Sequence, residues 1–216
     1  MKLPIDPVLH LLHRAPAATL ATLSVLLPGY PYATVVPNVV DAQHCPVLLI
    51  SALAEHTKNL LADPRVSLSV VDPATDDVAS AARLTLVGNA EALPPDTALQ
   101  ARYLRYQPSA AQYLQLDFQF FRIVPQRVRF IAGVGQMGWF DRTEWTPLPS
   151  LPEPAEAALL AALDSACAPT VELLGIDPFG LDYRHNGQRQ RGLFTSATSS
   201  PDALAALART LLSVLR

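Results

Sequence analysis

The residues from Ser51 to Asn59 have the composition of an anion-binding turn. They read SALAEHTKN and lie where an apolar strand ends and a short helix is expected to begin. The first backbone N–H groups of a helix have no partner inside the helix, and they favour an anion. Thr57 adds a hydroxyl donor and Lys58 adds a positive charge, and both suit a phosphate. The alternative is an ordinary solvated helix start.

Two other motifs have simpler interpretations. GVGQMG at residues 133–138 matches GxGxxG, but a dinucleotide site needs a helix that opens at the glycines. The following WFDRTEWTPLP has no helical period, so we expect a glycine-rich strand exit. His44 and Cys45 are adjacent in an expected turn, and adjacency alone does not place a base on the thiol.

The histidines and cysteines do not predict a metal site. His10 and His13 lie three residues apart on an expected helix, a spacing that two ligands of one metal ion can have. No third ligand follows at a useful spacing, so we expect a surface or half-buried pair. Cys45 and Cys167 are the two cysteines of the chain, too few for a zinc site or a disulfide framework.

The elements around these residues indicate a mainly antiparallel β domain. Runs rich in Val, Leu, Thr and Tyr alternate with turns, and there is no alternating strand–helix rhythm. We expect six or seven strands in a closed or nearly closed barrel, with two or three short helices inserted. Strands are expected at 18–26, 32–40, 47–50, 66–71 and 83–93, with a hairpin of 118–124 and 127–132, and helices at 7–14, 54–65 and 96–106.

A proline-rich stretch divides the chain. Residues 147–154 read PLPSLPEP and have the composition of a linker. We therefore expect a barrel domain over residues 1–147 and a small α+β domain over residues 148–216. A barrel that ends near Ser150 is expected to fold by itself. In the second domain, helices are expected at 155–166 and 201–215, and strands at 181–183 and 192–195.

The composition limits the class of protein. Half of the 216 residues are hydrophobic and 16% are charged, which favours a folded core over disorder. A net charge of −3 argues against a nucleic-acid binder that is held by phosphate contacts. The apolar runs are too short for a membrane span, and the first residues resemble no signal or transit peptide. We expect a cytoplasmic protein that binds a small molecule, with no nucleic-acid or membrane partner.

The combined pattern resembles the flavin-binding split-barrel superfamily of pyridoxamine 5′-phosphate oxidase. The similarity lies in ATLATLS, GYPYATVVPNVVD and, most specifically, LAEHTKNLLADPRVSL. The sequence is most similar to the haem iron utilisation (HugZ-like) branch, which DFQFFRIVPQRVRFIAGVGQMGWF and GIDPFGLDYR also fit. The resemblance implies an α+β, mainly β fold: a six-stranded antiparallel split barrel with short helices and a small C-terminal α+β domain.

The resemblance also implies where a cofactor binds. FMN is expected in a cleft between the subunits of a homodimer, with Tyr32 and its strand along the flavin. Ser51 is expected near the ring or the phosphate, and Thr57 and Lys58 at the phosphate. Arg83 would bring a second positive charge to a phosphate or a haem propionate. The other cofactor-binding residues assigned from the motif are His56 and Asn59.

The chemistry at this site stays open at the level of sequence. The chain fits an FMN-dependent oxidoreductase, a haem-binding or haem-degrading oxygenase-like protein, or a ligand-free interaction module. No side chain identifies itself as a proton donor or base, so the catalytic residues are unknown. The aromatic residues Phe118, Phe120 and Trp139 are expected to anchor the dimer, because interface cores are rich in aromatic side chains.

Overall fold

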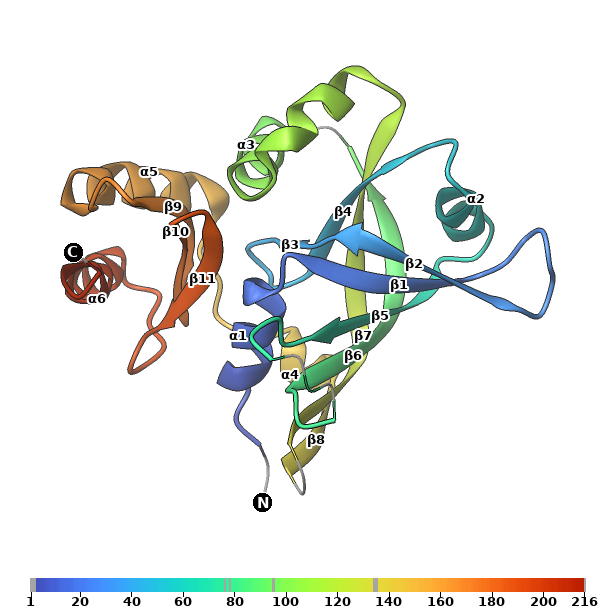
Figure 1. Cartoon of the computed structure of the whole chain (residues 1–216), viewed down its shortest axis with the longest axis horizontal. Coiled ribbons are helices and arrows are strands. Elements are labelled where there is room, and N and C mark those ends of the chain that lie inside the picture. Colours follow the sequence, from blue (N-terminus) through green and yellow to red (C-terminus); the bar gives the residue numbers. More distant parts are fainter. Residues whose placement is uncertain (1–2, 76, 78, 95, 134–135, 216) are drawn as a thin grey trace.

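An antiparallel sheet forms the larger part of the molecule (Figure 1). The computed structural model describes residues 3–75, 77, 79–94, 96–133 and 136–215. Within these residues the sheet has eight strands, because the short β3 and β8 add to the six expected for a split barrel. The strands follow the order β2 (Pro31–Pro37), β1 (Ala17–Leu23), β5 (Arg65–Val71), β6 (Arg83–Leu93), β7 (Phe118–Gly133), β4 (Pro46–Ser51) and β3 (Val39–Val40), and β8 (Gln136–Asp141) also pairs with β7.

The helices of this part are short. None of the helices in the described ranges is long and apolar enough to cross a membrane. Of the motif GVGQMG, Gly133 ends β7 and Gln136–Gly138 begin β8, so its described residues lie in strands; the two residues between them are outside the described part of the chain. The helical segments are α1 (Asp6–Arg14), α2 (Glu55–Ala62), α3 (Thr97–Tyr106), the 3-10 segment η1 (Pro108–Gln115) and α4 (Arg142–Trp145).

The hairpin expected around Pro125 is wrong, because β7 runs through this residue as one strand of 16 residues. Its register against β6 shifts where Gly88 pairs with Pro125 and Val87 pairs with Arg127. A bulge at this point accommodates a proline, which has no N–H to donate to the ladder. Gly88 is required beside it, since a Cβ at that position would lie 2.3 Å from the carbonyl oxygen of Val124.

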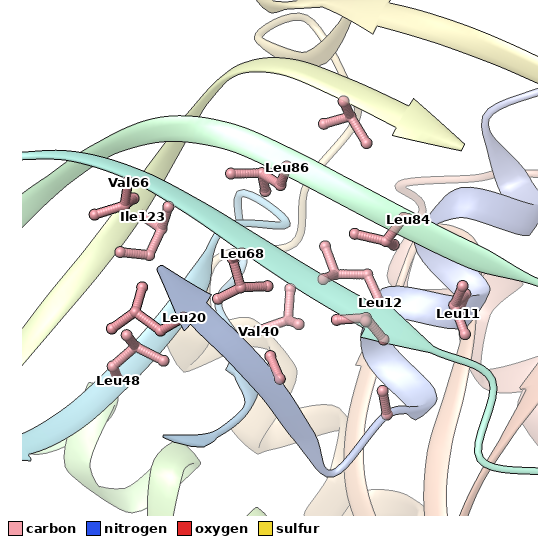
Figure 2. Close-up of a cluster of buried hydrophobic side chains, with 14 of the residues drawn as sticks. Leu11, Leu12, Leu20, Val40, Leu48, Val66, Leu68, Leu84, Leu86 and Ile123 are labelled. Atoms are coloured by element: carbon pink, nitrogen blue, oxygen red, sulfur yellow. The ribbon is translucent and has the colours of Figure 1, made fainter. Parts of the chain in front are cut away.

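Alternating side chains of the strands fill the barrel (Figure 2). In β5, Val66 and Leu68 point inward while the intervening Ser67 is half-buried, as the period of two predicted. Leu12 of α1 joins the same cluster, so α1 closes one side of the barrel core. Replacing one such buried leucine by alanine typically costs about 2–5 kcal/mol of stability.

The C-terminal unit is a three-stranded sheet covered by two helices. Its strands follow the order β11 (Gln188–Leu193), β10 (Gly180–His185) and β9 (Val171–Asp177), of which β9 was not expected from the sequence. Asn186 and Gly187 have φ values of 51° and 79°, as a tight hairpin turn between β10 and β11 requires. The helical segments are α5 (Glu153–Leu163), the 3-10 segment η2 (Asp164–Ala166) and α6 (Pro201–Ser213).

The C-terminal unit is packed onto the rest of the molecule. Helix α1 lies between the barrel and the small sheet (Figure 1). Phe179 belongs to the barrel core and Leu174 to a second cluster under α3. In the proline-rich stretch, Leu151 is buried in the C-terminal core and Leu148 packs against the barrel. This stretch is therefore anchored at both ends rather than a free linker.

We expect a chain that ends at Ser150 to be strongly destabilised, which replaces the expectation of an independent barrel. The truncation removes Phe179 from the barrel core, and it removes the acidic partner Glu156 from the buried Arg102. A buried charge that loses its partner costs about 3–5 kcal/mol, a large part of the stability of a domain. Thermal unfolding and size-exclusion chromatography measure the effect. Adding residues 151–216 as a separate fragment should restore stability, whereas a monodisperse truncated chain with an unchanged unfolding temperature would contradict the prediction.

Candidate functional site

The segment from Ser51 to Asn59 forms the end of β4, a tight turn and the first half of α2. The carbonyl of Ser51 accepts the N–H of Ala54 at 3.2 Å and the hydroxyl of Thr57 at 2.6 Å. These bonds close the turn. They leave the N–H groups of Glu55 and His56 without an acceptor among the described residues. Two adjacent free N–H groups at a helix start are the backbone of an anion site.

Two of the predicted site residues hold this turn in place. Thr57 is fully buried, and the hydroxyl proton expected to reach a phosphate is already donated to the Ser51 carbonyl. Asn59 is also fully buried, with its Oδ1 accepting from the N–H of Val25 and its Nδ2 donating to Oγ1 of Thr22, both at 2.9 Å. Thr57 and Asn59 therefore shape the site rather than face a ligand.

The charges around the turn are mixed. Lys58 is exposed on α2, while burial lowers the pKa of His56, so the imidazole is neutral at pH 7. Glu55 lies in the first turn, and the carboxylate of Asp117 accepts from the hydroxyl of Ser51 at 3.4 Å. Lys58 is thus one cation against two carboxylates. Binding of an anion at this turn therefore depends on Lys58, on the free N–H groups and on any cation that a second subunit contributes.

Tyr32 lies beside the same turn. It pairs with Thr22 across the β1–β2 ladder, and the Thr22 hydroxyl connects the Tyr32 carbonyl to Asn59 of α2. A shallow hollow of ≈ 280 Å³ lies over β1 and β5 and includes Thr22, Ser67 and Arg65 in its lining. Arg65 is exposed and was not singled out from the sequence, although its place directly after Asp63-Pro64, at the end of the motif, is a signal for it.

Arg83 is not close to the turn within one chain. Ser51 pairs with Phe118, and Phe120, two residues on, pairs with Leu93 at the far end of β6. Arg83 begins this 11-residue strand, so roughly 30 Å of strand, at about 3.3 Å per residue, separates it from the end near the turn. The structure thus brings together all the predicted cofactor-binding residues except Arg83, which can act at the same ligand only from a second subunit.

An apolar surface flanks the turn. At the tip of the β1–β2 hairpin, Leu26 is 74% exposed and Tyr30 is 67% exposed, and Val25 and Leu27 are exposed beside them. Leu53, in the turn itself, is 75% exposed. Large apolar side chains grouped in this way mark an interaction surface rather than the scattered exposure of a monomer.

The three predicted dimer anchors differ in the structure. Phe120 is buried in the core under α3, where its ring packs edge-on against Tyr103, so its assignment to an interface is wrong. Phe118 is half-buried and stacks on Tyr113. Trp139 is exposed on β8 beneath the guanidinium of Arg127, 4.2 Å from its ring centre. The hairpin tip exposes four large apolar side chains, Val25, Leu26, Leu27 and Tyr30.

A buried polar network joins the barrel to the C-terminal unit. Glu156 accepts hydrogen bonds from the guanidinium groups of Arg102 and Arg105, and from the N–H of Ile176 at 3.1 Å. One turn further along the same face of α3, the hydroxyl of Tyr106 donates to Asp182 at 2.7 Å. None of these residues could be identified from the sequence, because their partners are far apart in the chain.

The histidines belong to the same network. His13 is fully buried, with Nδ1 3.1 Å from Asp182 and Nε2 3.1 Å from Nδ1 of His44. Asp177 lies 3.5 Å from His13 Nδ1, and Arg191 pairs with both carboxylates at 2.8 Å. The expected surface or half-buried pair of His10 and His13 is therefore wrong for His13, whose partner is His44.

The barrel and the turn after β4 together define a split-barrel protein. The chain matches the pyridoxamine 5′-phosphate oxidase family over residues 6–132, more than half of its length. It belongs to this family, as the resemblance of the sequence indicated.

Individual relatives extend this comparison. The chloroplastic non-canonical heme oxygenase HOZ of Arabidopsis thaliana is 35% identical over 148 residues, which are 66% of this chain and 46% of that protein. The chain thus spans about half the length of this curated relative. A heme-binding protein from Mycobacterium smegmatis is 28% identical over 100% of this chain and 98% of its own, with a TM-score of 0.62. The protein Atu2129 of Agrobacterium tumefaciens, of unknown function, shares the fold over 95% of this chain and 98% of its own (24% identity, TM-score 0.71).

Proposed function

We propose that the chain is an FMN-binding protein of the haem utilisation type that works as a homodimer. The phosphate of FMN binds at the start of α2, and the flavin ring extends toward the strand of Tyr32. The supporting observation is the pair of free N–H groups of Glu55 and His56 beside the exposed Lys58. A bound flavin would supply the redox chemistry, and the protein would position it.

The charge balance of the turn supports a site that two subunits share. In one chain, Lys58 is accompanied by the carboxylates of Glu55 and Asp117. These charges together attract a phosphate with two negative charges only weakly. A second cation has to come from elsewhere, and Arg83 can supply it only from the partner subunit. The apolar hairpin tip beside α2 provides a surface through which such a partner can dock.

Haem is the second candidate ligand, and the two relatives named for heme favour it. Haem iron needs an axial His, Cys, Met or Tyr. His13, His44 and Cys45 are buried, which leaves exposed or half-buried candidates outside the core. Of these, the half-buried His56 lies in the proposed FMN site. Its Nε2 is itself buried and has no hydrogen-bond partner among the described residues, so the side chain has to turn outward to reach a haem iron. Haem and FMN would therefore compete for the same turn.

The visible spectrum of the purified full-length protein tests the proposed function. A flavin spectrum, with the flavin released on denaturation and identified as FMN, supports the FMN assignment. If the apo protein instead gives a Soret band after addition of haem and takes up no FMN, haem is the ligand. His56→Ala then tests the axial position. Binding of neither ligand would refute the proposal and leave an interaction module.

We expect a stable dimer at micromolar concentration, formed through the hairpin tip. Leu26→Asp introduces a charge into the exposed apolar surface, so it should convert the dimer to monomer and weaken FMN binding with it. Val214→Asp is a matched control, because Val214 is equally exposed but lies at the end of the chain after α6. Light scattering measures both variants. A monomeric wild-type chain, or a dimeric Leu26→Asp variant, would contradict this arrangement.

A further inference from the structure

A cavity of ≈ 650 Å³ lies beside α1, the helix that Figure 1 shows between the barrel and the C-terminal sheet. Ligand pockets in proteins commonly have volumes of about 300–1,000 Å³ and often lie between structural units. The lining comes from α1 and the residues after it, the loop after β5, the C-terminal end of α3 and the β10–β11 hairpin. The described lining includes no residue of the turn from Ser51 to Asn59, so this cavity is separate from the proposed FMN site.

The wall of the cavity has four positive side chains and, among its described residues, no carboxylate. The four are Arg14, Arg184, Arg189 and Arg191. The carboxylates that form ion pairs with arginines of this set are Asp72, Glu172, Asp177 and Asp182. None of these carboxylates lines the cavity, so the guanidinium groups are nearer to it than their partners are.

The effect of this arrangement can be followed at His10, which lies on the cavity wall. Burial lowers the pKa of His10, and so do the nearby Arg191 and Arg14. The carboxylates of Asp182 and Asp72 act in the opposite direction, with a smaller effect. The electrostatic potential at the wall is therefore positive, and His10 itself is neutral at pH 7.

Arg189 is held in a fixed position at this wall. Its two terminal nitrogens donate to backbone carbonyls, Nη1 to that of Asn38 at 2.8 Å and Nη2 to that of His13. Its guanidinium also lies over the ring of Tyr106, 4.6 Å from the ring centre. Arg189 forms no ion pair within the described part of the chain. Its charge is thus immobilised without being paired, which lowers the entropy lost when an anion binds beside it.

Other lining side chains have donors to spare. Arg14 uses only Nη2 for its bond to Asp72, so its Nε and Nη1 have no acceptor within the described ranges. Gln190 accepts the hydroxyl of Tyr183 through Oε1, which leaves its amide N–H groups unpaired among these residues. Gln188 is exposed at the start of β11, next to Arg189. Charged and neutral donors of this kind suit an oxyanion.

We propose that this cavity binds a small organic anion that carries carboxylate or phosphate groups. Planar guanidinium groups bind both kinds of oxyanion through paired hydrogen bonds. Pro16, Pro73 and Ala74 add apolar surface for the carbon skeleton of the ligand. Because the lining comes from both parts of the molecule, the bound anion also stabilises the packing of the C-terminal unit on the barrel.

Isothermal titration calorimetry of the full-length protein with citrate and with inorganic phosphate, at constant ionic strength, tests this site. We expect saturable binding of at least one of them, and the tighter of the two identifies the preferred oxyanion. Gln188→Glu adds a negative charge at the wall without changing the size of the side chain, so it should weaken binding by about tenfold. Gln188→Lys should strengthen binding. The matched control Gln115→Glu, exposed on η1 outside the lining, should bind as the wild type does.

The Lys58→Ala variant separates this cavity from the phosphate site proposed at α2. The dependence of binding on the charge at residue 188 should persist in that variant. Loss of all citrate and phosphate binding in Lys58→Ala would place the anion at α2 and overturn the proposal. A folded wild-type chain without saturable binding, or equal affinities of Gln188→Glu and Gln188→Lys, would overturn it as well, because the cavity would then be a water-filled seam.

Discussion

Replacing Glu156 by alanine is expected to lower the free energy of unfolding by about 3–5 kcal/mol, because it leaves a buried charge without its partner. Glu156 is 1% exposed and is the ion-pair partner of both Arg102 and Arg105. Arg102 is itself buried, so without Glu156 its guanidinium has neither a carboxylate nor water beside it. Chemical denaturation, followed by circular dichroism, measures the loss.

A second glutamate of the same unit provides the control for this prediction. Glu172 pairs with Arg184 through an exposed carboxylate. Exposed ion pairs contribute about 0–1 kcal/mol, so Glu172→Ala should change the stability little. Similar losses in the two variants would mean that the Glu156 contacts do not hold the C-terminal unit on the barrel.

Lys58→Ala is expected to weaken FMN binding by about ten- to a hundredfold, the equivalent of about 1.5–3 kcal/mol for a charge-assisted contact. Lys58 is exposed and has no side-chain hydrogen bond or ion pair among the described residues, so the unfolding temperature of the apo protein should stay nearly unchanged. Glu55→Gln should act in the opposite direction and strengthen FMN binding, because it removes a negative charge from the same helix turn. Fluorescence titration measures the affinities.

Riboflavin separates a phosphate contact from a general effect on the site. It lacks the phosphate, so its weaker binding should not respond to Lys58→Ala. An equal loss of affinity for riboflavin and FMN would place Lys58 at the ring or in the fold of the site. The assignment of the phosphate to the start of α2 would then have to be withdrawn.

The sequence predicts the local elements of the barrel well because their signals are local. The alternation of Val66, Ser67 and Leu68 identifies β5, and the motif before Asp63-Pro64 identifies α2. Pro125 leads to the wrong prediction of a hairpin, because proline commonly interrupts a strand. The bulge that accommodates it depends on Gly88 of the neighbouring strand. The pairing of strands across the sheet is not encoded in either segment alone.

The sequence likewise predicts only part of the site. The turn from Ser51 to Asn59 is contiguous, so its anion-binding backbone can be foreseen from the residues. The hydrogen bond from the Thr57 hydroxyl to the Ser51 carbonyl cannot be foreseen, because it depends on where that carbonyl points in the folded turn. The partner of His13 is equally hidden, since His44 and Asp182 come from distant segments that meet only in the folded chain.

The position of α1 between the barrel and the small sheet has a consequence for synthesis of the protein. Helix α1 is made long before Asp182 and Arg189, which contact its last turn. During translation the apolar face of α1 can pack on the barrel before the polar partners of His13 have been made. The buried polar network around His13 therefore stays incomplete until β10 and β11 have been made, and the folded protein depends on this late, long-range contact. A stop codon before the codon of Asp182 would leave the network incomplete, so such truncated products should be recognised and degraded as misfolded.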